Sequence, residues 1–196
     1  MTFSEICKDI YSNNLLFAAV VAVLFPFAII ALGLFLNALR DALGVIVGFV
    51  TDPIIVYGAI NYVFFPGVML HELSHALFAF LTGAEVTEIA LFKKDGDSLG
   101  HVNFKNRGNL FLVALQNTFA SSAPMFCGAA VVWGCYFGIT HISILWIRIL
   151  LGYLGVSMFC HMTMSVQDIK IYVKGIPIFM GLLFILTLVL RLFGVI

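Results

Sequence analysis

Two histidines and a glutamate lie within five residues of one another in the stretch PGVMLHELSHALFAFL, residues 66–81. His71 and His75 are four residues apart, so on an α-helix their side chains project from one face, about one turn apart. Two imidazoles at this spacing can coordinate one Zn²⁺ ion at about 2.0–2.1 Å. Glu72 follows the first histidine and can lie beside the open coordination position as a general base. HELSH therefore matches the HExxH pattern of metallohydrolases.

The residues around this motif are almost all apolar, and this makes the polar groups costly. On membrane insertion scales, each ionisable side chain inside a bilayer costs about 2.5–3.5 kcal/mol. A bound divalent cation would offset that cost for Glu72 and both histidines. The alternative is that the histidines hydrogen-bond across helices and that Glu72 pairs with Arg148. The motif favours the metal.

The composition predicts a membrane protein. Of the 196 residues, 62% are hydrophobic and 10% are charged, and the mean hydropathy is +1.11. Soluble domains carry about 25% charged residues, so this chain cannot cover its surface with polar groups. Its net charge of zero argues against a nucleic-acid partner. The four cysteines form no CxxC pair, and three of them lie inside apolar runs, which indicates small apolar residues and not disulfide partners.

Five apolar tracts are candidates for crossing a bilayer, which takes about 20 residues. They cover about residues 15–36, 54–82, 110–138, 142–164 and 176–193. The second and third tracts are each nearly 30 residues long, so one of them could contain an additional span. The segment 42–52 is too short to cross alone. The sequence therefore predicts one all-α polytopic membrane domain over residues 1–196. Its five or six transmembrane helices would surround a buried zinc site.

The distribution of lysine and arginine predicts the orientation, because these residues accumulate on the cytoplasmic side. With five spans, one side receives Lys8, Lys93, Lys94, Lys105, Arg107, Lys170 and Lys174. The other side receives Arg40 and Arg191. This imbalance predicts a multi-pass protein with a cytoplasmic N-terminus and its C-terminus outside.

The connection over residues 83–109 contains strand and turn signals. A β-prone run begins near Val86, KKDGD supplies turn residues, and HVNF can return as a second strand. We expect a β-hairpin over about residues 85–104 at the membrane surface. A solvated loop is the alternative.

The stretch HELSHALFAFLTGAEVTEIALF, followed by GHVNF, resembles the site-2 protease family of intramembrane zinc metalloproteases in its small bacterial form. In that family the two histidines of HExxH bind zinc, the glutamate is the catalytic acid and base, and a distal aspartate is the third ligand. The resemblance implies that His71 and His75 are zinc ligands and that Glu72 is the base. It also implies a bacterial or archaeal cell membrane.

The third ligand requires its own argument, because a catalytic zinc usually keeps three protein ligands and one open position. Asp168, in MSVQDIK, is the best candidate. It follows the fourth span and would lie on the same membrane side as the end of the HELSH helix. His161, seven residues earlier, is the alternative ligand. Asp168 could instead pair at the surface with Lys170 or Lys174.

Four further polar residues are candidates for binding substrate. Asn117 and Ser121 are one turn apart in the third tract and could face the site, although small polar residues also hold membrane helices together. His101 and Asn103 alternate on the second expected strand and could face the cleft or the surface.

Together these features predict an intramembrane zinc metalloprotease that cleaves a membrane-protein substrate in or near a transmembrane segment. The hairpin could hold an unwound substrate by adding it as a strand. Two alternatives use the same residues: a zinc-dependent hydrolase of a lipid amide, and a non-catalytic zinc-binding membrane protein. The expected partners are the substrate and the lipid bilayer.

Overall fold

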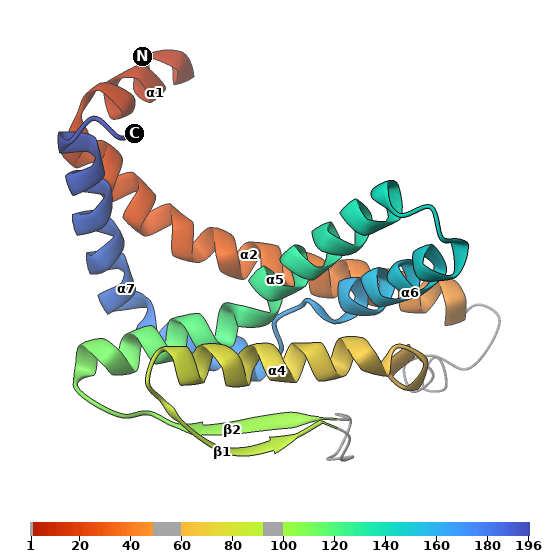
Figure 1. The fold of residues 1–196 in the computed structure, drawn as a ribbon. Helices are drawn as coiled ribbons and strands as arrows, with labels where there is room; N and C mark the ends of the chain where they lie inside the picture. The colour runs from red at the N-terminus through yellow and green to blue at the C-terminus, as the bar shows by residue number, and fades with distance from the viewer. Residues whose placement is uncertain (1, 49–59, 92–99) are drawn as a thin grey trace.

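The structure is a computed structural model that describes residues 2–48, 60–91 and 100–196 (Figure 1). Its elements are α1 (Phe3–Ser12), α2 (Asn14–Gly48), α4 (Phe65–Leu81), β1 (Glu85–Ala90), β2 (His101–Lys105), α5 (Leu110–His141), α6 (Leu145–His161) and α7 (Val166–Leu192). The prediction of a mainly helical protein, with a small sheet after the HELSH helix, is therefore confirmed.

Three helices of the described chain are long and apolar enough to cross a membrane. They are Asn14–Ala42, Leu110–His141 and Val166–Leu192. Helices α4 and α6 are apolar but shorter, with 17 residues each. Five or six crossings therefore stay a prediction, while three helices meet the requirement by length and composition.

All five predicted tracts have different boundaries in the structure; the second, 54–82, corresponds to α4 over Phe65–Leu81. Helix α2 continues to Gly48, through most of the segment 42–52 that the sequence analysis judged too short to cross alone, and residues 49–59 lie outside the described residues. Helix α5 continues through Pro124 without interruption. It ends at His141, three residues beyond the predicted end of the tract at 138. Membrane helices tolerate proline because neighbouring groups satisfy the freed backbone.

Helix α7 begins ten residues before the predicted start at 176, and this places Asp168 inside it. The reason is a capping box. The Ser165 side chain accepts from the Asp168 N–H, and the Asp168 carboxylate accepts from the Ser165 N–H. The predicted span 142–164 is also shortened, because α6 ends at His161 and residues 162–164 connect it to α7.

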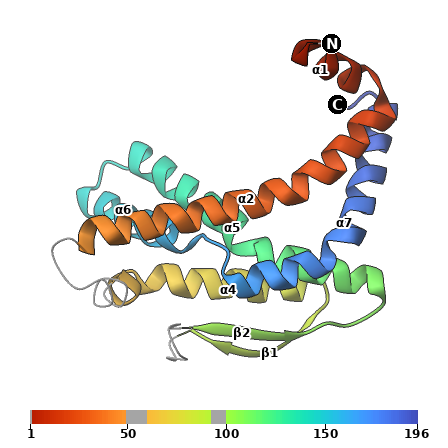
Figure 2. The same ribbon diagram turned by 180° about the vertical axis from the view of Figure 1, so that it is seen from behind.

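The hairpin is antiparallel and packs against α4. Its register runs from Glu85↔Lys105 to Ala90↔His101, with a bulge between Val86 and Glu88. Gly83, with φ of 82°, makes the turn from α4 into β1. Both views show the two strands running beside α4 (Figures 1 and 2). The predicted hairpin is therefore confirmed, and its tip, residues 92–99, lies outside the described residues.

The two ends of the described chain lie together (Figures 1 and 2). The Arg191 guanidinium, at the end of α7, donates to the Tyr11 carbonyl of α1 and lies 4.6 Å from the Tyr11 ring centroid. The placement of the termini on opposite membrane sides stays a prediction, which this proximity does not favour. That prediction counted every apolar tract as one straight crossing, whereas α5 and α7 contain Pro124 and Pro177 and both bend.

Candidate metal centre

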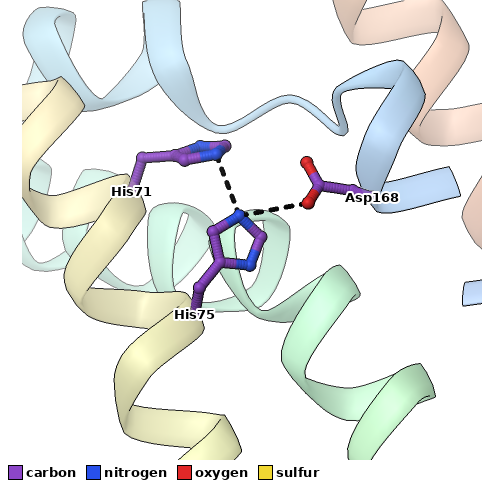
Figure 3. Close-up of side chains that lie close together, drawn as sticks. All are labelled: His71, His75 and Asp168. Carbon is purple, nitrogen blue, oxygen red and sulfur yellow. Dashed lines mark hydrogen bonds and ion pairs between the residues drawn. The ribbon is translucent and has the colours of Figure 1, made fainter. Parts of the chain in front are cut away.

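Three ligand groups converge between α4 and the start of α7 (Figure 3). The Nε2 atoms of His71 and His75 are 3.1 Å apart, and Asp168 Oδ1 is 3.3 Å from His75 Nε2. The ligand atoms of these three residues all lie within 4.8 Å of one another. His75 and Asp168 are buried, and His71 is partly exposed. The structure thus brings together the three residues that the sequence analysis proposed as ligands.

Each histidine ring is oriented by a backbone carbonyl. His71 Nδ1 lies 2.7 Å from the His161 carbonyl, and His75 Nδ1 lies 2.8 Å from the Ala120 carbonyl. A carbonyl oxygen only accepts, so each ring carries its proton on Nδ1. Both Nε2 lone pairs then point into the space shared with Asp168. Partners of this kind fix the tautomer and orientation of histidine ligands in metalloproteins.

The two carbonyls are available for a specific reason: neither has its usual partner within its helix. Ala120 is four residues before Pro124, which has no N–H to donate back to it. His161 is the last residue of α6, where carbonyls have no helical donor. Two helix irregularities therefore supply the acceptors that orient the two rings.

The donor set fits a divalent cation. Two Nε2 lone pairs and a carboxylate meet, and no donor hydrogen stands among them unless one ring takes up an extra proton. Tetrahedral zinc with bonds of about 2.0–2.1 Å separates its ligand atoms by about 3.3 Å. The separations of 3.1 and 3.3 Å are close to that value, and the third pair, His71 and Asp168, lies within 4.8 Å. His71, His75 and Asp168 are thus the residues that would hold the ion.

A close contact between α4 and α6 brings the His161 carbonyl to His71. The Gly67 N–H donates to Ser157 Oγ over 2.7 Å, and Ser157 Oγ donates to the Phe64 carbonyl over 2.8 Å. A Cβ on Gly67 would overlap the Ser157 carbonyl and lie 2.6 Å from His161 Nδ1. Only glycine at this position, one turn before His71, lets the end of α6 approach so closely.

His161, the alternative third ligand, does not join the cluster. Its Nδ1 lies 2.8 Å from the Ser157 carbonyl, and its Nε2 lies 3.3 Å from Asn61 Oδ1. Its backbone carbonyl contacts His71, and His161 lines the same cavity without joining the three groups of the cluster. The geometry therefore favours Asp168 over His161.

Asp168 uses its two carboxylate oxygens for different partners. Oδ2 accepts from the Ser165 N–H at 2.8 Å and caps α7, and Oδ1 faces His75. The capping box holds the carboxylate in place from its own helix. The alternative role for Asp168, a surface ion pair with Lys170 or Lys174, is absent from the ion pairs of the described residues, and Asp168 is buried.

Glu72 is buried on α4 and lines the same cavity as the three ligands. It interacts electrostatically with His75, Asp168 and His101. The predicted alternative, pairing with Arg148, does not occur among the described ion pairs. Arg148 is exposed near the start of α6, about 20 Å along that helix from His161.

The cavity at the cluster has a volume of about 710 Å³. We call it the metal cavity. It is lined by α2, by α4, by the β2 end of the hairpin and by the start of α7. Asn37 and Arg40 of α2, with Asn61, add polar groups to its wall, and the sequence analysis did not assign them to the site. The sequence feature that could have identified Asn37 and Arg40 is their polarity within the otherwise apolar helix α2.

Asn117 and Ser121, both on α5, have different surroundings in the structure. Ser121 is buried and lines the metal cavity. Asn117 is buried too, but its Oδ1 accepts from Asn106 Nδ2 at 2.8 Å and so ties the segment after β2 to α5. Asn117 therefore holds elements together, the alternative that the sequence analysis left open.

His101 and Asn103 are linked through Glu88 on β1. His101 Nε2 lies 3.4 Å from Glu88 Oε1, and Asn103 Nδ2 donates to Glu88 Oε2 at 3.1 Å. His101 lines the metal cavity, and its buried Nδ1 makes no hydrogen bond with the residues that the structure describes. Asn103 is exposed and is not among the residues lining this cavity. Of this pair, only His101 is placed to contact a bound molecule.

Comparisons of the chain with models of known protein families, with curated proteins and with solved structures find no match. Membership of the site-2 protease family therefore stays a prediction that rests on the motif and its sequence context. The geometry of the candidate metal centre stands independently of that resemblance.

Proposed function

We propose that this chain is an integral membrane zinc metalloprotease that hydrolyses a peptide bond in or near a transmembrane segment of a protein substrate. The observation that carries the proposal is the convergence of His71, His75 and Asp168, with Glu72 on the same cavity wall. A buried site with two imidazoles and one carboxylate has the ligand composition of catalytic zinc sites.

A bilayer as the surrounding medium is supported by the exposed apolar surface. Phe80, Leu110 and Trp146 are 71%, 75% and 78% exposed, on three different helices. Apolar surface of this extent needs lipid or protein to cover it. We propose a multi-pass arrangement with the N-terminus in the cytoplasm of a bacterial or archaeal cell.

The proposed chemistry assigns one task to each residue. His71, His75 and Asp168 hold the cation, which when bound supplies Lewis-acid polarisation of a carbonyl and lowers the pKa of water to about 7. Glu72 takes a proton from the attacking water and delivers it to the leaving amine. The water oxygen ends in the new carboxylate and the C–N bond breaks. His101 would hydrogen-bond to the substrate, and Ser121, whose hydroxyl donates to the Asn117 carbonyl, would accept a hydrogen bond there.

The hairpin offers a way to hold an extended substrate. Gly100, His101 and Val102 of the β2 end line the metal cavity. A substrate strand added to this edge would satisfy backbone groups that unwinding exposes. The pairing would present the scissile carbonyl close to Glu72.

Two substitutions test the role of Glu72 and the ligands. Glu72→Gln should retain zinc and lose at least about 100-fold in cleavage rate, the usual contribution of a general acid–base. His71→Ala should lose both zinc and cleavage. Glu85→Gln is the matched control, because Glu85 is exposed and pairs with Arg107 outside the cavity.

The measurements are metal content by mass spectrometry and cleavage of a transmembrane model substrate in detergent. Cleavage by Glu72→Gln at the parental rate would overturn the assignment. Hydrolysis of a lipid amide, with the peptide untouched, would favour the first alternative function. A zinc-loaded protein that cleaves neither would favour the non-catalytic one.

A further inference from the structure

We propose that α1 lies along the membrane–water interface, with one face in lipid, and that it marks the membrane surface at which both ends of the described chain meet. This inference concerns a part of the molecule remote from the metal centre. It does not depend on the proposed protease activity.

The first observation is the clean division of α1 into two faces. Phe3, Ile6, Cys7 and Ile10 recur at the i, i+3, i+4, i+7 spacing of an apolar helical stripe. The opposite face carries Glu5, Lys8, Asp9 and Ser12. This pattern is typical of helices that lie in a membrane interface.

The second observation is that the protein itself does not cover the apolar stripe. No residue of α1 is buried, and Phe3 and Tyr11 are 82% and 63% exposed. A ten-residue helix is marginal in water, even with the capping box between Thr2 and Glu5. The apolar stripe therefore requires an outside medium.

The occupant of that face follows from its neighbours. Asn13 alone separates α1 from α2, the most apolar of the three helices able to cross a membrane. The exposed apolar surface continues directly into α2, where Leu15 is 62% exposed. Helix α1 turns away from the line of α2 in both views (Figures 1 and 2). At about 15 Å it is too short to cross, so lipid at the surface is the medium it shares with α2.

The third observation is the aromatic and cationic group at the junction. The Arg191 guanidinium lies 4.6 Å from the Tyr11 ring centroid and 4.5 Å from that of Phe17, and it donates to the Tyr11 carbonyl. Tyrosine and arginine are residues that anchor membrane segments at the interface. Their contact joins α1 and the end of α7 at one membrane surface.

The charges of α1 indicate how it binds. The polar face has two carboxylates and one amine, so attraction to anionic lipid cannot be the main contribution. Burial of the apolar stripe must supply the binding, and zwitterionic phosphatidylcholine should suffice.

The test uses Cys7 as a natural labelling site in the apolar stripe. In a chain whose other three cysteines are replaced by serine, Cys7 carries an environment-sensitive fluorophore, and the protein is reconstituted in phosphatidylcholine vesicles. The matched control carries the label on the polar face, as Ser12→Cys in a Cys7→Ser chain. Quenchers are iodide in water and lipids spin-labelled at a shallow or a deep acyl position.

We expect the Cys7 label to be quenched by the shallow lipid at least twofold more than by the deep lipid, and weakly by iodide. The Ser12→Cys label should show the reverse, with strong quenching by iodide. Equal iodide access at both positions would place α1 in water and overturn the proposal. Strongest quenching by the deep lipid, or protection of Cys7 from every quencher, would overturn it as well.

Hydrogen exchange on the unmodified chain is the second measurement, because it requires no cysteine replacement. The backbone amides of residues 3–12 should exchange at least tenfold more slowly in vesicles than expected for an unstructured peptide. Exchange at the unstructured rate would overturn the proposal.

Discussion

Pro124 is predicted to act on the metal centre through a carbonyl that it leaves free. In Pro124→Ala, the new N–H at position 124 would donate to Ala120, completing the helical bond that proline prevents. The Ala120 carbonyl would then be shared with His75 Nδ1, which it now meets at 2.8 Å. The His75 ring would lose part of its orientation.

The size of the effect follows from the two interactions that change. Loss of a hydrogen-bond partner behind a metal ligand typically lowers metal affinity by about 10–100-fold, or about 1.4–2.7 kcal/mol. Alanine is about 3 kcal/mol more favourable than proline inside a helix. We therefore expect zinc affinity to fall at least tenfold while the stability of the metal-free protein does not fall.

The assay is a competitive zinc titration of the metal-free protein in detergent, with thermal unfolding measured in parallel. Pro177→Ala is the control, because Pro177 also lies inside a helix and frees the carbonyl of Val173, which is not among the residues lining the metal cavity. Its zinc affinity should match that of the parent. Parental affinity in Pro124→Ala would refute the reasoning.

Three further predictions concern the same centre. Gly67→Ala should lower zinc affinity at least tenfold, because the new Cβ would push the end of α6 away; Gly181→Ala, where a Cβ meets nothing within 4 Å, should leave the affinity in the same titration unchanged. Asp168→Ala should lose zinc and His161→Ala should keep it, as metal analysis of the purified proteins would show, because only the backbone of His161 contacts a ligand; the opposite pattern would exchange their roles. Val102→Pro on β2 should lower cleavage at least tenfold without loss of zinc, and unchanged cleavage would remove the strand-addition hypothesis.

The sequence predicts the local parts of the site well. Helical periodicity places His71 and His75 on one face. The position of Asp168 beyond the fourth tract makes it the first candidate for the third ligand, with His161 left as the alternative. The hairpin also follows from alternation and turn residues. The helix face and the hairpin depend on interactions between residues close in sequence, where sequence patterns are most informative, whereas Asp168 depends on the order of the tracts.

Some features were accessible but were not used. The letters SVQD, residues 165–168, form a capping box and mark the start of α7. Pro124 inside the third tract indicated a free carbonyl at Ala120. Which side chain would use that carbonyl depends on how α4 packs against α5, and no local pattern contains this information.

The placement of the chain ends could not be predicted from apolar tract lengths. A count of tracts assigns each one a full and straight crossing. The bends in α5 and α7 contradict that assumption. Arg191 contacts Tyr11 although the two residues are 180 positions apart in the sequence. The polar wall contributed by Asn37 and Arg40 likewise appears only when α2 is placed against the site.

Asp168 caps α7 with one carboxylate oxygen and faces His75 with the other, and this limits which residues can replace it. A histidine at this position could still offer a nitrogen to zinc, but it has no second oxygen with which to accept from Ser165. The exchange would preserve coordination chemistry and undo the first turn of α7. Conversely, a partner that unwinds the first turn of α7 would move the Asp168 carboxylate away from His71 and His75. The proposed zinc site would then lose its third ligand without any contact between the partner and the ion.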